Sequence, residues 1–120
     1  MAEKVSVEIA LQEGVAAAVF KAVSLSGQEE IAAISKQIGR FIEDNHPAYL
    51  VFDFGEVKFF SSQVLGILLD IRGKMNSYGG QVVISSINPQ LYRVFKITNL
   101  DKIFRFFPDK QSAIRAARAN

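Results

Sequence analysis

The chain has 120 residues, of which 49% are hydrophobic and 22% charged, and its formal net charge is +2, all ordinary for one globular domain. It contains no cysteine, which excludes disulfides, thiolate metal sites and thiol catalysis. No apolar run approaches the roughly 18 residues of a membrane helix, and residues 1–4 do not start a signal peptide. We therefore expect a cytoplasmic protein with no membrane role. Its basic residues do not form a dense patch or a recognisable nucleic-acid-binding motif, so they do not predict nucleic-acid binding.

The first third of the chain predicts two strands and a helix. Apolar residues alternate with polar ones from Val5 to Leu11, which is the period of a half-buried strand. Glu13-Gly14 is a turn signal, after which Val15 to Val23 can return as a second strand. Apolar residues then recur at helical spacing and predict a helix over 28–43, with a Ser-x-x-Glu capping box that starts at Ser26.

The middle of the chain predicts two buried strands on either side of a long helix. Tyr49 to Phe54 is nearly all apolar, which suits a strand covered on both faces, as strands of parallel sheets are. After a loop and Ser61-Ser62, a broad apolar face predicts a helix over 63–77. Gln81 to Ser85 is another strand of the buried type.

The C-terminal part continues the alternation. Asn88-Pro89 has the composition of an N-cap followed by a first helical residue, and Asn99 can close that helix in a left-handed conformation. Ile103 to Phe107 predicts a short strand, and Pro108-Asp109 introduces a final helix. Strands that alternate with helices in this way predict an α/β fold in which helices pack against a mixed β-sheet.

Ser62 lies between an aromatic strand end and a long helix with an apolar face. Serine is a favoured N-cap residue, and the start of a helix has unpaired N–H groups and a partial positive charge. The host domain would tolerate a phosphate there, and the phosphate would add close to two negative charges to any surface that a partner buries. The simpler interpretation is that Ser61 and Ser62 only cap the helix.

Several segments in the right order resemble the STAS family of anti-sigma-factor antagonists, from Tyr49 to Ala117. The first is an apolar strand with an acidic position near its end, followed by Val57-Lys58-Phe59-Phe60-Ser61-Ser62-Gln63-Val64-Leu65-Gly66. The second is Gly79-Gly80-Gln81 before a strand, and the third is Asn88-Pro89 at the start of a helix. The fourth is the segment from Val94 to Phe104. The resemblance implies a STAS-like fold, and we expect a single such domain over residues 1–120.

Leu65-Gly66 sets the register against the family motif Asp-Ser-Ser/Thr-Gly-Leu-Gly. In this register Ser62 matches the serine that is phosphorylated in family members, and Ser61 replaces the acidic residue before it. Gln63 replaces the second Ser or Thr, and Val64 replaces the glycine. The resemblance thus implies phosphorylation of Ser62, with Ser61 as the weaker candidate. It also implies a serine kinase/anti-sigma factor as the protein partner, and a phosphatase as a further one.

We expect the partner to bind at residues around the motif: Asp53, Phe60, Ser61, Ser62 and Gln63. Asp53 ends a central strand, at the sheet edge where ligands bind in α/β folds, and we expect it to accept hydrogen bonds from loop N–H groups near Ser61 and Ser62. An exposed aromatic beside Ser62 would anchor a partner. The same fold could instead serve as a constitutive, non-phosphorylated scaffold, an alternative that the altered motif residues favour.

An enzyme is not expected. His46 precedes the strand whose far end leads to Ser62, and a strand of this length spans about 20 Å, so His46, Asp53 and Ser62 cannot form a triad. His46 is interpreted as an ordinary loop residue. The sequence also offers no phosphate loop or metal cluster, so we expect no cofactor and no metal. A small-ligand binder or enzyme would need a deep polar pocket near Asp53 and Ser62. The sequence does not decide the oligomeric state.

Overall fold

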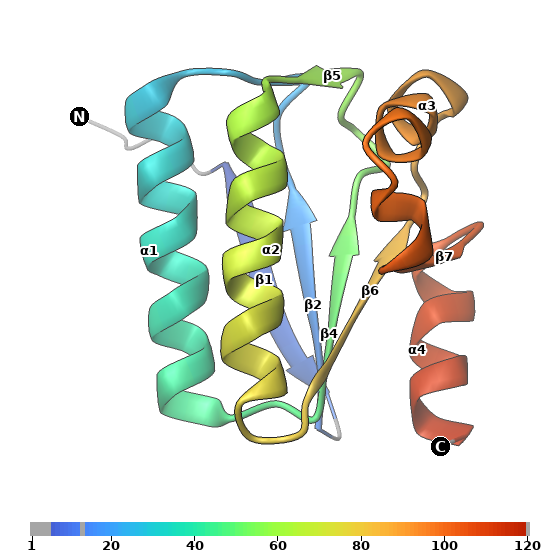
Figure 1. Ribbon diagram of the computed structural model, residues 1–120. Coiled ribbons are helices and arrows are strands. Elements are labelled where there is room, and N and C mark those ends of the chain that lie inside the picture. Colours follow the sequence, from blue (N-terminus) through green and yellow to red (C-terminus); the bar gives the residue numbers. More distant parts are fainter. Residues whose placement is uncertain (1–5, 13, 120) are drawn as a thin grey trace.

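The computed structural model describes residues 6–12 and 14–119 as an α/β fold (Figure 1). Its main sheet has five strands in the order β1-β2-β4-β6-β7, and β1 is antiparallel to β2 while the other neighbours are parallel. These strands are β1 (Val7–Gln12), β2 (Val15–Phe20), β4 (Tyr49–Asp53), β6 (Gln81–Ser85) and β7 (Arg105–Phe107). The parallel pairing brings the C-terminal ends of β2, β4, β6 and β7 to one edge of the sheet.

Helices cover both faces of this sheet. The helices α1 (Gln28–Asn45) and α2 (Ser62–Asn76) lie side by side on one face, and α4 (Lys110–Ala119) lies on the other (Figure 1). Alternate residues of β4 serve the two faces, because Phe52 packs in the large cluster under α1 and α2 and Val51 packs in the smaller one under α4. The predicted α/β fold with a mixed sheet is confirmed.

The remaining elements gather near the C-terminal edge of the sheet. The helix α3 (Pro89–Ile97) and the 3₁₀ turn η1 (Leu100–Lys102) follow β6. Asn88 is the N-cap of α3, as predicted, and its Oδ1 accepts a hydrogen bond from Leu91 N at 2.9 Å. Asn99 has a φ of 63°, so the predicted left-handed residue at the end of this helix is also confirmed.

One local prediction was wrong, the capping box at the start of α1. The N-cap is Gly27, with no side-chain capping bond, and Ser26 Oγ instead lies 3.1 Å from Ser24 Oγ. Just before α1, β3 (Ser24–Leu25) pairs in parallel with β5 (Phe59–Phe60), a two-stranded ladder that the sequence analysis did not predict. Ser26 directly follows this ladder, and its hydroxyl lies beside Ser24 and not at the start of the helix. Among residues 6–12 and 14–119, no helix combines the length and apolarity that a bilayer span requires.

Candidate functional site

The predicted phosphorylation site lies at the beginning of α2. Ser62 is exposed and is the first residue of the helix. The N-cap is Ser61, not Ser62, because Ser61 N donates to Leu25 O at 2.9 Å and this bond keeps Ser61 in an extended conformation (φ −80°, ψ 161°). Helical angles therefore begin one residue later. Gln63 is exposed beside Ser62, whereas Val64 and Leu65 are buried and fix the orientation of the helix.

The two hydroxyl groups at this helix start differ in their surroundings. Ser61 Oγ is buried and has no hydrogen-bond partner among the described residues. It makes no side-chain capping bond, although it occupies the position at which serine normally accepts one. The Ser62 hydroxyl is open to solvent and bonds no other described residue. Only the Ser62 hydroxyl can be approached by another protein without moving its neighbours.

The segment that leads to Ser62 is supported by packed aromatic rings. The Phe60 ring lies 5.8 Å from that of Phe54 and 6.0 Å from that of Phe95, measured between centroids. Phe60, the predicted docking residue, is therefore half-buried and packs inward. Its neighbour Phe59 is 57% exposed instead. Adjacent strand residues face opposite ways, so covering one ring exposes the other.

Asp53 has a supporting position rather than an open one. Its Oδ1 accepts from Gly55 N at 2.9 Å, and its Oδ2 accepts from the hydroxyls of Ser85 at 2.8 Å and Ser86 at 2.9 Å. The side chain is buried, and the predicted bonds to N–H groups near Ser61 and Ser62 are not made. The reason is the parallel register, which places Ser85 directly opposite Asp53.

The Asp53 bonds hold two loops at the C-terminal edge of the sheet. Gly55 begins the loop toward β5, and Ser86 begins the loop toward α3 in a left-handed conformation with φ 61°. A non-glycine residue in this region is strained, and its bond to Asp53 offsets part of that strain. Asn88 Nδ2 joins the same two loops by donating to Val57 O at 3.1 Å. The carboxylate thus positions the backbone that carries Phe59 and Ser62.

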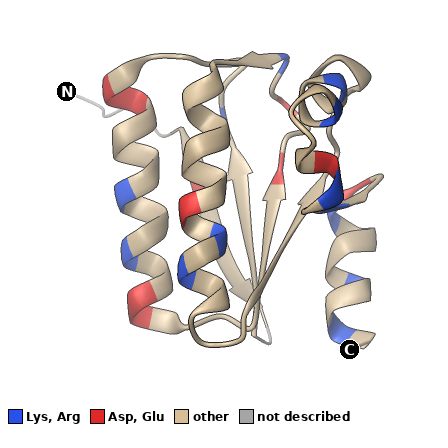
Figure 2. Cartoon of the chain, in the orientation of Figure 1, with Lys and Arg blue, Asp and Glu red and all other residues tan. Residues whose placement is uncertain are grey.

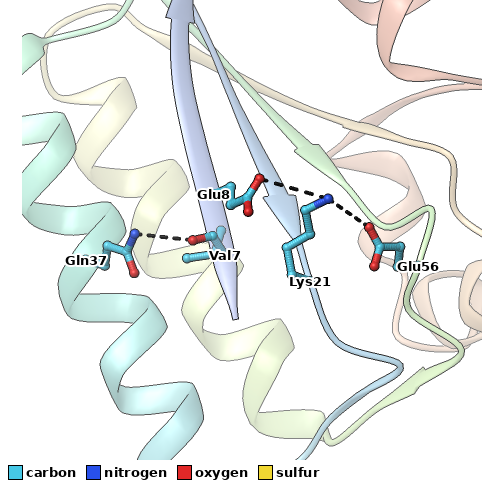
Figure 3. Close-up of polar contacts among 5 residues, drawn as sticks. All are labelled: Val7, Glu8, Lys21, Gln37 and Glu56. Atoms are coloured by element: carbon cyan, nitrogen blue, oxygen red, sulfur yellow. Dashed lines mark hydrogen bonds and ion pairs between the residues drawn. The ribbon is translucent and has the colours of Figure 1, made fainter. Parts of the chain in front are cut away.

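A surface ion pair fastens the same loop to the end of β2 (Figure 3). Lys21 Nζ lies 3.0 Å from Glu56 Oε2 and 4.0 Å from Glu8 Oε1. The hydrogen bond from Lys21 to Glu56, helped by both carboxylates, raises the pKa of Lys21 above its ordinary value. The ion pair is exposed to solvent, so it contributes little to stability.

His46, Asp53 and Ser62 do not come together as a triad in the structure. His46 caps the end of α1 at the opposite edge of the sheet, where its ring lies 5.1 Å from that of Tyr78. Within residues 6–12 and 14–119, no group of three or more His, Asp or Glu side chains is placed to hold a metal ion. Because the Asp53 oxygens are bonded internally, they are not directed at a ligand.

Comparison with known proteins gives consistent matches. Residues 9–113 match the STAS domain family. The chain is 22% identical over 81 residues to an anti-sigma F factor antagonist of Paenibacillus polymyxa. The aligned residues cover 68% of this chain and 69% of that protein. An anti-sigma factor antagonist of Mycobacterium paratuberculosis, whose structure is solved, is 27% identical, with a TM-score of 0.77 and coverage of 93% and 92% of the two chains.

The fold is also that of the anti-sigma factor antagonist SpoIIAA. Its unphosphorylated form has a TM-score of 0.82 at 15% identity, with coverage of 95% of this chain and 97% of that one. The phosphorylated form of the Bacillus protein has a TM-score of 0.70 at 14% identity, with coverage of 92% and 98%. Because the family match extends from β1 to α4, this chain belongs to the STAS domain family, as a domain of the kind found in anti-sigma factor antagonists.

Proposed function

We propose that this protein binds a serine kinase/anti-sigma factor through the start of α2 and releases it when Ser62 is phosphorylated. The observation that carries the proposal is the exposed hydroxyl of Ser62 at the first position of a 15-residue helix. The SpoIIAA relative, which exists in phosphorylated and unphosphorylated forms, supports the same scheme. We place the protein in the cytoplasm, where it would meet such a kinase, and a phosphatase would restore the binding form.

The position of Ser62 allows a switch that needs no refolding. A phosphate at the start of a helix lies near the unpaired N–H groups and the positive end of the helix dipole, so the domain itself tolerates the charge. A partner that covers this surface would instead have to bury close to two negative charges, which disrupts docking. The phosphate charge therefore weakens binding of the partner strongly but changes the stability of the domain little.

The docking surface that we propose contains Phe59, Ser61, Ser62 and Gln63. Phe59 is exposed directly before the motif, and buried aromatic anchors carry much of the energy of protein interfaces. Asp53 and Phe60 act from behind this surface as positioning residues, because their contacts hold the loop and strand in place.

Phosphate mapping tests the modification. The purified protein is incubated with ATP and a candidate serine kinase of the anti-sigma-factor type, and the phosphorylated residue is located by mass spectrometry. We expect phosphate on Ser62 and none on the Ser62→Ala variant. The matched control is Ser77→Ala, which removes an exposed serine at the other end of the same helix and should leave phosphorylation unchanged. Phosphate on Ser61 alone, or on neither serine, would contradict the proposal.

Binding measurements separate the switch from the constitutive scaffold. We expect Ser62→Ala to bind the kinase as the native chain does, and Ser62→Asp to bind at least about tenfold more weakly. The scaffold alternative is favoured by Ser61, Gln63 and Val64, which replace family motif residues. It requires that both variants bind equally well, and that result would remove the switch.

A further inference from the structure

The strand β1 leaves one edge of the sheet unpaired. Lys21 N donates to Ser6 O at 2.7 Å, which makes Ser6 and Lys21 a hydrogen-bonded pair. Along an antiparallel pair of strands every second residue is hydrogen-bonded to its partner, so Glu8 and Ala10 are the next residues of β1 that exchange hydrogen bonds with β2. The backbone groups of Val7, Ile9 and Leu11 consequently face outward. Val7 O accepts from Gln37 Nε2 at 3.3 Å (Figure 3), which leaves the outward groups of Ile9 and Leu11 without a described partner. Such an edge is a template for another strand.

A groove runs beside this edge between β1 and α1. It has a volume of about 800 Å³ and is lined by Ile9, Ala33, Lys36, Gln37, Arg40 and Phe41. Ile9 and Phe41 are half-buried and supply an apolar floor. Lys36 and Arg40 are exposed, and neither forms an ion pair with another described residue. The groove therefore combines apolar surface with two cations that are available to an acidic ligand.

The charges along α1 indicate which kind of partner fits. Acidic residues lie at both ends of the helix, at Glu29-Glu30 and Glu43-Asp44, and Lys36 and Arg40 lie between them (Figure 2). A second copy joined edge to edge about a two-fold axis would place the two α1 helices antiparallel. The basic centres would then face each other, and so would the acidic ends. This repulsion argues against a second copy and favours an acidic partner.

We propose that the outer edge of β1 and this groove bind an extended acidic segment of a protein partner as an additional strand. Its backbone would pair with Ile9 and Leu11, in the strand-addition mode of peptide recognition. The spacing of the charges agrees with this geometry. Lys36 and Arg40 are separated by about 6 Å along the helix axis, and alternate residues of a strand by about 6.6 Å. Acidic side chains at alternate positions can therefore meet both cations. The site is independent of Ser62 and of the proposed switch.

The test uses hydrogen exchange on the ¹⁵N-labelled full chain at low salt. The probe is a blocked synthetic peptide of about seven residues, near the usual length of a strand, in which threonine alternates with glutamate. At saturating peptide, we expect amide exchange at Ile9 and Leu11 to slow at least about tenfold. Exchange at Glu8 and Ala10 should not change, because their N–H groups already donate to β2.

Matched variants test the charges. The double variant Lys36→Glu/Arg40→Glu should bind the peptide at least about tenfold more weakly. The double variant Arg93→Glu/Lys96→Glu makes the same charge change on the exposed face of α3 and should bind as the native chain does. An equal loss in both variants would show that only the net charge matters, and would overturn the proposal.

Modified peptides test strand pairing without altering the protein. A peptide with lysine in place of glutamate, and one N-methylated at alternate amides, should both fail to slow exchange at Ile9 and Leu11. Undiminished binding of either peptide would overturn the proposal. The proposal would also be overturned if, without peptide, exchange at these two amides slowed as the protein concentration rose. That result would show that a second copy of the chain occupies the edge.

Discussion

The end of β4 and the start of α2 lie close in the sequence but use their polar groups in opposite ways. Both carboxylate oxygens of Asp53 are bonded within the domain, to Gly55, Ser85 and Ser86. The hydroxyls of Ser61 and Ser62 bond no other described residue. One edge of the sheet thus carries a carboxylate that supports the fold and, beside it, an exposed hydroxyl that the fold does not use.

Removing the Asp53 carboxylate should have the largest effect on stability. Asp53→Ala leaves the Ser85 hydroxyl unpaired at 0% exposure and frees the strained Ser86. We expect the free energy of unfolding to fall by about 2–4 kcal/mol, measured by urea denaturation. Asp70→Ala removes an exposed carboxylate from α2 and should change it by less than about 0.5 kcal/mol. Similar stability of the two variants would mean that the Asp53 bonds do not support the edge.

The neighbours Phe59 and Phe60 should separate binding from stability. Phe60→Ala removes a half-buried ring that contacts Phe54 and Phe95, and we expect a loss of about 2–3 kcal/mol in unfolding free energy. Phe59→Ala removes an exposed ring and should cost less than about 0.5 kcal/mol. It should nevertheless weaken kinase binding about tenfold or more. If Phe59→Ala binds normally, the proposed docking surface is misplaced.

The smallest effect is expected at Ser61, where replacement of an N-cap should be harmless. Ser-to-Ala at an N-cap usually costs about 0.5–2 kcal/mol, but Ser61 makes no capping bond and buries an unpaired hydroxyl. Ser61→Ala should therefore leave the unfolding free energy unchanged or raise it slightly. Asn88→Ala is the control and should destabilise by about 1 kcal/mol, because Asn88 bonds both Leu91 and Val57. Equal losses would show that Ser61 does cap the helix in solution.

The sequence predicted those features that depend on local patterns. Periodicity located the long helices and the buried strands, and Asn88-Pro89 marked the start of α3 correctly. Features that depend on distant contacts were missed. Which of Phe59 and Phe60 is covered depends on Phe95, a residue of α3.

The partners of Asp53 follow from the register between β4 and β6. Parallel strands are joined by a long crossover and not by a tight turn, so no short stretch of sequence sets this register. The ladder between β3 and β5 has too few residues to show any period. These contacts decide how the site is presented, so the position of Ser62 could be predicted from the sequence but the surface around it could not.

The short ladder between β3 and β5 also has a dynamic consequence. It pairs two residues of each strand, Ser24 with Phe59 and Leu25 with Phe60, and it is separate from the main sheet. Small units of this kind open at lower free energy than the core around them. We therefore expect the segment before Ser62 to open while the rest of the domain stays folded. Under the proposed function, this opening would let a kinase draw the serine into its catalytic cleft.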